Sequence, residues 1–235
     1  MRKKPESKVY ANVEYKHSVY IDCVKRILDI FVAVVGGIVA IPLLLVISII
    51  TFFDVGFPII FKQERVGKGG KSFTMYKFRN MTNECDENGE LLPPQDRVTK
   101  IGKVIRATSL DELPQIWNIL KGDMSVIGPR PYPPEYVSCY TKEQLRRLSV
   151  KPGLECPAYK KENTPKTWDD QFNNDVWYVD HCSFLVDFHQ CFRLVHMVFD
   201  FKNSTKNRRI DGGREDPIPL SERQEVAEKL IEINN

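Results

Sequence analysis

The N-terminal quarter of the chain differs sharply from the rest in its hydrophobic pattern. From Ile27 to Phe53 nearly every side chain is apolar, the exceptions being Asp29, Ser48 and Thr51. A helix over this segment would be about 40 Å long, whereas the hydrocarbon core of a bilayer is roughly 30 Å thick. The pattern therefore predicts a membrane helix.

Two topologies fit this segment. A straight, tilted helix would span the bilayer. However, Pro42 lies near the middle and removes one backbone hydrogen bond, and basic residues flank both ends, whereas a spanning helix carries them mainly on its cytoplasmic side. These basic residues are Arg2, Lys3, Lys4, Lys16, Lys25 and Arg26 before the segment, and Lys62, Arg65, Lys68 and Lys71 after it. Two half-helices that meet at Pro42 and return to the side of entry would explain both features, and the residues alone leave spanning and re-entry equally open.

A strand pattern follows the apolar segment. PIIFKQ is an apolar run, VGKGGKS is a glycine-rich basic turn and SFTMYKFRNM alternates, which together predict a hairpin between residues 57 and 81. Because strand side chains alternate, Phe73, Met75, Lys77 and Arg79 share one side. Lys77 and Arg79 are therefore candidate phosphate ligands, although lysines that protect a solvated edge strand show the same pattern.

The stretch RATSLDELPQIWNILKGDMSVIGPRP, residues 106–131, combines a short helix with charged residues at both ends. Apolar side chains at helical spacing predict a buried face and a helix that ends near Gly122; they are Leu113, Ile116, Trp117 and Leu120. The preceding segment DRVTKIGKVIRAT predicts a short basic helix whose inward face carries Ile101, Val104 and Ile105.

Two adjacent acids stand at the predicted start of the central helix. Free N–H groups there favour an ionised Asp111 and a bound phosphate, with Glu112 beside it. Arg106 lies just upstream, and Arg130 is fixed between two prolines, so both can fork onto phosphate oxygens. Each feature alone is also typical of a helix cap or a stiff turn, but together, next to a membrane segment, they favour phosphate chemistry.

An aromatic stripe marks the last predicted helix, with Phe184, Phe188, Phe192, Val195 and Phe199 at helical spacing. Burial in the core and burial in a membrane interface fit this stripe equally well.

The composition narrows the class of protein. The chain has 235 residues, enough for one domain with appendages, and its net charge of only +3 argues against a nucleic-acid binder. Basic residues outnumber acidic ones between residues 62 and 106, which suits an anionic membrane surface or an anionic substrate.

Three stretches resemble the bacterial sugar transferases, which are monotopic phosphoglycosyl transferases (polyprenyl-phosphate hexose-1-phosphate transferases). They are KRILDIFVAVVGGIVAIPLLLVISI, QERVGKGGKSFTMYKFRNM and DRVTKIGKVIRATSLDELPQIWNILKGDMSVIGPRP. The resemblance runs from about residue 25 to 200, and the order KFR, DELPQ, LKGDMS and GPRP is highly specific.

The resemblance implies a mixed α/β, mostly helical fold. Residues 1–24 would form a polar basic segment and residues 25–56 a re-entrant membrane helix broken at Pro42. Residues 57–202 would form a small cytosolic α+β catalytic domain with interfacial amphipathic helices, and residues 203–235 a polar tail. The expected location is the cytoplasmic face of the bacterial inner membrane.

The same resemblance implies an activity. The family transfers a sugar-1-phosphate from a UDP-sugar to polyprenyl (undecaprenyl) phosphate and releases UMP, the first membrane step of capsule, exopolysaccharide or O-antigen synthesis. Asp111 would be the nucleophile that forms an aspartyl phosphosugar, and Glu112 would bind Mg²⁺. Arg130 would be the main phosphate ligand, supported by Arg106, Lys77 and Arg79. Membrane lipids are expected contacts, nucleic acid is not, and a homodimer is left open.

Two departures from the family pattern stand out. Ile41 precedes the proline where the family usually has serine, and the loop at residues 151–163 carries Glu155, Cys156 and Tyr159 in place of smaller or amide residues. The second departure bears on the choice of sugar. Two other functions use the same features: a non-catalytic membrane-anchored adaptor that binds anionic lipid, and a metal-dependent phosphohydrolase acting on lipid diphosphates.

Overall fold

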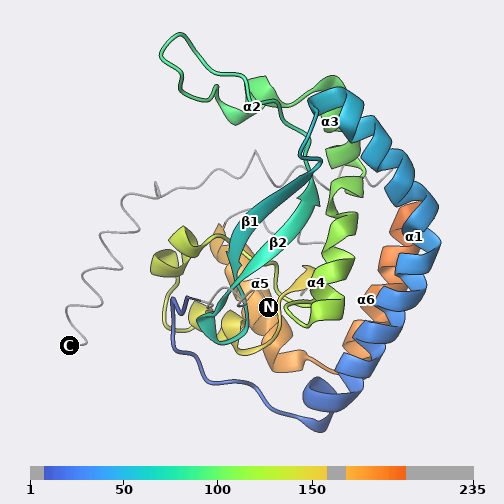
Figure 1. The fold of residues 1–235 in the computed structure, drawn as a ribbon. Helices are drawn as coiled ribbons and strands as arrows, with labels where there is room; N and C mark the ends of the chain where they lie inside the picture. The colour runs from blue at the N-terminus through green and yellow to red at the C-terminus, as the bar shows by residue number, and fades with distance from the viewer. Residues whose placement is uncertain (1–7, 158–167, 200–235) are drawn as a thin grey trace, which may run out of the picture.

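One long helix runs along a side of the molecule (Figure 1). The computed structural model describes residues 8–157 and 168–199. Helix α1 (Lys25–Val55) follows a π-helical turn, η1 (Tyr20–Val24). Within the described residues, the combined stretch Tyr20–Val55 is the one helix long and apolar enough to cross a membrane, as judged by length and composition.

The predicted division of α1 into two half-helices at Pro42 is not seen. The helix stays continuous across the proline and curves instead (Figure 1), as a helix does when one backbone bond is lost but both ends are held. At one end Arg26 donates to the carbonyls of Ile119 and Leu120, at 2.6 and 2.9 Å. At the other end Asp54 accepts a 2.6 Å hydrogen bond from the Thr99 hydroxyl. Re-entry stays a prediction.

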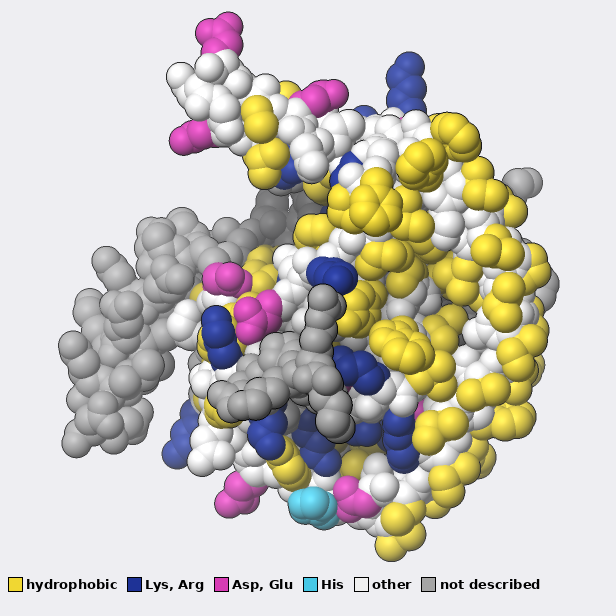
Figure 2. All heavy atoms as spheres, in the orientation of Figure 1, with side chains coloured by type: hydrophobic (Ala, Val, Ile, Leu, Met, Phe, Trp, Pro, Cys, Tyr) yellow, Lys and Arg dark blue, Asp and Glu magenta, His cyan; other side chains and the backbone are white. Residues whose placement is uncertain are grey.

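The polarity of α1 is the reverse of that of a helix in a water-soluble protein. Lys25, Asp29 and Thr51 are among the buried residues that face the rest of the chain. The outward face is apolar and exposed; it includes Ile27, Phe31, Ile38, Val39, Leu45, Ile49 and Phe53. These side chains contribute to the hydrophobic band along the right edge of Figure 2, which is the surface expected of a helix in contact with lipid.

The predicted hairpin is confirmed. Strands β1 (Ile60–Val66) and β2 (Ser72–Phe78) pair antiparallel in a register that runs from Ile60–Phe78 to Val66–Ser72. A short 3₁₀ turn, η2 (Lys68–Gly70), joins them. Gly70 has a φ of 71°, and a Cβ there would lie 2.1 Å from the carbonyl oxygen of Ala11, so this turn requires glycine.

A second, parallel pair of strands forms the centre of the main core. β3 (Ser125–Ile127) pairs with β4 (Gly153–Glu155). Helix α5 (Trp168–His181) contacts β3 through the Tyr178 hydroxyl, which donates to the carbonyl oxygen of Ile127, and it packs against the 3₁₀ turn η5 (Gln144–Ser149). A further 3₁₀ turn, η4 (Pro134–Cys139), lies against β1. The buried cluster joins α1 to these elements; it consists of Ala33, Ile119, Met124, Val126, Ile127, Val150, Tyr178 and Val179.

Residues 82–97 project from the body as an arm that ends in α2 (Pro94–Arg97) (Figure 1). Helix α3 (Lys100–Ala107) follows, and here the predicted inward face is only partly right. Ile105 is buried, but Ile101 and Val104 are 45% and 63% exposed. The reason is that α3 packs against the chain on the side of Gly102. A Cβ at this position would lie only 2.4 Å from the carbonyl oxygen of Asn80.

Helix α6 (Phe184–Phe199) also presents its aromatic side outward. Phe184, Phe188 and Phe192 are 47%, 60% and 69% exposed, whereas Asp187 and Gln190 are buried. The side chains of Val195 and Phe199 lie outside the described residues. Core burial is therefore wrong for the described part of the stripe, while membrane contact stays a prediction.

Candidate active site

Asp111 and Glu112 lie in a 3₁₀ turn, η3 (Leu110–Gln115), that leads directly into α4 (Ile116–Lys121). The helix ends as predicted at Gly122, which has a φ of 92°. The predicted buried face is wrong at Trp117, which is 60% exposed. Because η3 has about three residues per turn rather than 3.6, the stripe changes phase before α4 begins, and Asn118 and Ile119 are buried instead.

Asn118 fixes α4 against the hairpin. Its side-chain amide donates to the carbonyl oxygen of Thr74 at 2.7 Å, and its side-chain oxygen accepts from the N–H of Tyr76 at 3.2 Å. These two hydrogen bonds pair backbone groups at the edge of β2 and place Lys77 next to η3. The sequence analysis missed this residue, although a polar side chain between apolar positions of a short helix is the signal that would have found it.

Glu112 pairs with two other predicted site residues, Lys77 and Arg130. Its Oε1 atom accepts from Lys77 Nζ on β2 at 2.8 Å and from Arg130 Nη2, after β3, at 2.9 Å. Burial alone would raise the pKa of this carboxyl, but the charges of Arg130 and Lys77 outweigh it and lower the pKa to about 2. Glu112 is therefore ionised at any physiological pH.

Asp111 is the more deeply buried acid, with only 5% of its surface exposed. Burial, and then the negative charge of Glu112, raise its pKa to about 6, against opposing effects of Lys77 and Arg106. At neutral pH it is mostly ionised but poorly solvated. A carboxylate in this condition is a stronger nucleophile than one in water, because less hydration must be removed before it attacks.

The charge of Arg106 acts on Asp111, and phosphate binding by Arg106 and by Arg79 stays a prediction. Arg79 follows β2, and its Nη2 atom lies 3.9 Å from where a Cβ on Gly56 would stand. Within the described residues it forms no ion pair with Glu112, and its Nε atom is buried without a hydrogen-bond partner.

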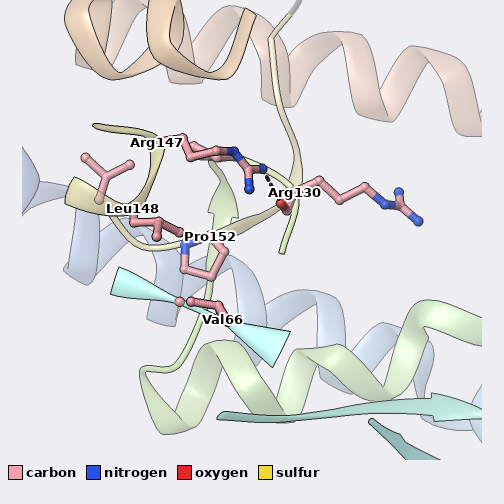
Figure 3. Close-up of a pocket in the computed structure, with 8 residues that line it drawn as sticks. Val66, Arg130, Arg147, Leu148 and Pro152 are labelled. Carbon is pink, nitrogen blue, oxygen red and sulfur yellow. Dashed lines mark hydrogen bonds between the residues drawn. The ribbon is translucent and has the colours of Figure 1, made fainter. Parts of the chain in front are cut away.

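Arg147 is a site residue that the sequence analysis missed (Figure 3). It is 2% exposed, and its Nη2 atom donates to the carbonyl oxygen of Arg130 at 2.6 Å. The same guanidinium donates through Nε and Nη2 to Asp175, at 3.0 and 2.6 Å, and through Nη1 to the Tyr140 hydroxyl at 2.7 Å. In Figure 3 the side chain of Arg130 extends away from Arg147. Arg147 thus holds the backbone of Arg130 while the Arg130 guanidinium reaches Glu112.

The acids are suited to a magnesium ion that arrives with a phosphate. No group of three or more His, Cys, Asp or Glu side chains able to hold a metal occurs among the described residues. Mg²⁺ does not need one, since it commonly binds one or two carboxylates together with substrate phosphates and water. Asp111 and Glu112 are adjacent oxygen donors, and both ion pairs of Glu112 end on Oε1, so these residues fit the ion.

Comparison with known proteins identifies the family of the chain. Residues 20–201 match the family described as bacterial sugar transferase. The chain is 44% identical over 163 residues to the uncharacterized sugar transferase EpsL of Bacillus subtilis (strain 168), covering 69% of this chain and 81% of that protein. It is 34% identical over 183 residues to the UDP-N-acetylgalactosamine-undecaprenyl-phosphate N-acetylgalactosaminephosphotransferase of Aeromonas hydrophila, covering 74% of this chain and 43% of that protein. It is also 38% identical over 143 residues to the UDP-glucose:undecaprenyl-phosphate glucose-1-phosphate transferase of Caulobacter vibrioides (strain ATCC 19089 / CIP 103742 / CB 15), covering 58% of this chain and 53% of that protein.

The chain therefore belongs to the bacterial sugar transferase family and is an enzyme, a phosphoglycosyl transferase. The non-catalytic adaptor is set aside.

Proposed function

We propose that this enzyme transfers a sugar-1-phosphate from a UDP-sugar to undecaprenyl phosphate through an aspartyl intermediate at Asp111. The names of the relatives from Aeromonas hydrophila and Caulobacter vibrioides support the acceptor and the donor class. One observation carries the mechanism: a buried aspartate lies beside a carboxylate that is paired with both Lys77 and Arg130. The reaction would be an early membrane step in making a surface polysaccharide.

The chemistry takes two steps. An oxygen of Asp111 attacks the β-phosphorus of the donor, the bond from that phosphorus to the bridging oxygen breaks, and UMP leaves with the electron pair. An oxygen of undecaprenyl phosphate then attacks the same phosphorus, and the bond to Asp111 breaks. The product is undecaprenyl diphosphate sugar, and the aspartate is regenerated as a carboxylate. A covalent carboxylate lets one pocket serve a soluble and a lipid substrate in turn.

Lys77 and Arg130 would bind the diphosphate. In the described structure both cations pair with Glu112, so they stand at a position that already accommodates an anion. Arriving phosphate oxygens can replace the carboxylate as their partners, and Arg106 adds positive charge near Asp111. Glu112 would hold Mg²⁺, which neutralises phosphate oxygens when bound.

The structure also supports a position in which both ends of α1 lie on the same side of the membrane. Both ends of α1 contact the same polar body, through Arg26 and through Asp54, while the outward face between them is apolar. A helix that crossed a bilayer would place its ends on opposite sides. Re-entry, or a helix sunk in one leaflet, keeps Asp111 on the side where the nucleotide sugar is dissolved.

The proposal is tested with the purified full chain, Mg²⁺ and undecaprenyl phosphate, offered a panel of UDP-sugars with UMP as the readout. We expect UMP release with one or a few sugars, and a sugar-phosphate adduct on Asp111 when the acceptor is omitted. Asp123→Asn is a matched control, because this carboxylate lies beyond the other end of α4 and pairs with Lys121.

Each contrary result points to a different function. If Asp111→Asn releases UMP as well as the control Asp123→Asn does, Asp111 is not the nucleophile. Free sugar phosphate formed without any acceptor would favour the phosphohydrolase instead.

A further inference from the structure

A second group of cations lies at the opposite end of α4 from Asp111. Arg26 donates to the last carbonyls of α4, and its Nη2 atom lies 3.3 Å from where a Cβ on Gly122 would stand. Lys151 Nζ lies 3.7 Å from the same point. The ammonium group of Lys68 lies over the Tyr15 ring, 4.7 Å from its centroid. Its positive charge also acts on Lys151 and lowers the pKa of that lysine. Three segments far apart in the sequence thus bring cations to one place.

Lys151 lacks a close counter-ion there. It is half-buried, and within the described residues no carboxylate forms an ion pair with it. Two carboxylates act on it from further away, but both already have partners. Asp29 accepts from the Ser125 hydroxyl and the N–H of Val126, and Asp123 accepts from Lys121 and Asn118.

The charge on Lys151 is held at a cost in free energy. Burial, and then the neighbouring Arg26, lower the pKa of this lysine. Bringing like charges together out of water is unfavourable, and an anion bound between them relieves the cost. The geometry therefore describes an anion site.

With α1 in the membrane as proposed above, the site lies at the depth of lipid headgroups. It is at the N-terminal end of α1, where the exposed apolar face begins with Ile27 and Phe31, 67% and 64% exposed. Figure 2 shows basic side chains gathered beside the lower end of the hydrophobic band. A helix whose apolar face is immersed in lipid holds this end among the headgroup phosphates.

We propose that Lys151, Lys68 and Arg26 bind the headgroup phosphate of an anionic phospholipid. The phosphates that react must reach Asp111, whereas η3 and α4 separate this site from Asp111 by about 20 Å at their usual rise per residue. A phosphate held here is therefore not the reacting one. A bound headgroup at this point fixes how the catalytic body stands on the membrane.

The test uses the full chain in a neutral detergent, titrated with short-chain phosphatidylglycerol and read as a shift in thermal unfolding temperature. We expect saturable stabilisation by phosphatidylglycerol and little by short-chain phosphatidylcholine. In Lys68→Gln/Lys151→Gln the apparent Kd should rise about 25-fold, at about fivefold per lysine. The control Lys62→Gln/Lys142→Gln removes the same charge from exposed positions elsewhere, and it should leave the Kd unchanged.

An unchanged Kd in the double variant, or an equal loss of affinity in the control, would overturn the proposal. Saturation by inorganic phosphate at the same concentration would also overturn it. Competition by undecaprenyl phosphate would overturn it too, because it would assign the site to the acceptor. If the double variant does not fold, Lys68→Gln alone gives the same comparison, with an expected fivefold change. Retained UMP release in detergent by the double variant would separate this site from the catalytic one.

Discussion

At the scale of single residues, two neighbouring acids have opposite electrostatic environments. Glu112 is paired with two cations and its pKa lies at about 2, whereas burial raises the pKa of Asp111 to about 6. The chain thus provides one permanently ionised carboxylate and one that gives up its proton near physiological pH. Such divergence between adjacent groups is typical of catalytic sites.

The raised pKa of Asp111 means that its charge opposes folding at neutral pH. A carboxyl whose pKa rises from 3.8 to about 6 stabilises the fold fully below pH 3.8 and loses that contribution as the pH rises through about 6. Asp111→Asn should therefore be more stable than the natural chain above pH 6, by an amount of the order of 3 kcal/mol, and equally stable near pH 4. Thermal unfolding in detergent across this range measures the difference, and a less stable variant at pH 7.5 would contradict it.

Activity should follow the same ionisation in the opposite direction. As the pH falls through about 6, Asp111 takes up a proton and can no longer attack phosphorus, so kcat/KM for the donor should drop by up to tenfold per pH unit. Glu112 does not titrate in this range. Initial rates of UMP release between pH 5 and 8 at constant ionic strength test this, and a flat profile is the result that would count against it.

At the scale of elements, the position of Arg130, the proposed phosphate ligand, depends on the packing behind it. Arg147 holds the Arg130 backbone, and its guanidinium lies 4.7, 5.0 and 5.3 Å from the ring centroids of Tyr132, Tyr140 and Phe172. Helix α5 supplies Asp175 on the other side. If Arg130 binds phosphate as proposed, Arg147 is a positioning residue that acts on the substrate through Arg130.

Arg147→Lys should impair donor binding more than turnover. Lysine has no fork to join Asp175, Tyr140 and the Arg130 carbonyl, so we expect KM for the UDP-sugar to rise about tenfold, with a smaller change in kcat. Arg146→Lys is the matched control, because Arg146 pairs with Glu143 and Asp180 at the surface, where such pairs contribute little. If both variants lose kcat with KM unchanged, Arg147 has only a structural role.

At the scale of the whole molecule, the apolar surface of α1 faces outward and its buried charged groups face inward. Lys25 and Asp187 form a buried ion pair at 2.5 Å between α1 and α6, and the Tyr178 hydroxyl donates to the same aspartate at 2.7 Å. The rest of the chain therefore holds α1 at several points along its length.

Labelling of single cysteines tests the topology that this arrangement supports. With the six natural cysteines replaced, Asn12→Cys and Lys62→Cys flank α1 at exposed positions. Because both ends of α1 contact one body, a membrane-impermeant maleimide should label both in inverted vesicles and neither in right-side-out ones. Labelling from opposite sides would show that the helix spans the bilayer.

The sequence predicted features that depend on neighbouring residues. The hairpin and the stop at Gly122 follow from short-range patterns, whereas the grouping of Asp111, Glu112, Lys77 and Arg130 follows from the motifs of the family resemblance. The exposure of Trp117, Ile101 and Val104 was not predicted, because the 3₁₀ turn η3 shifts the phase of the apolar stripe and Gly102 decides which side of α3 faces the chain. Arg147–Asp175 and Lys25–Asp187 join residues 28 and 162 positions apart, and no local pattern specifies such pairs.

The long separation between Lys25 and Asp187 sets an order of assembly during synthesis. Residues 25–55 leave the ribosome well before Asp187 is made, and at about 5–20 residues per second the interval is roughly 10–30 s. During that time Asp187 cannot yet pair with this lysine, so we expect Lys25 to stay hydrated. We therefore expect α1 to reach the membrane before α6 is made, and α6 to pack onto it afterwards.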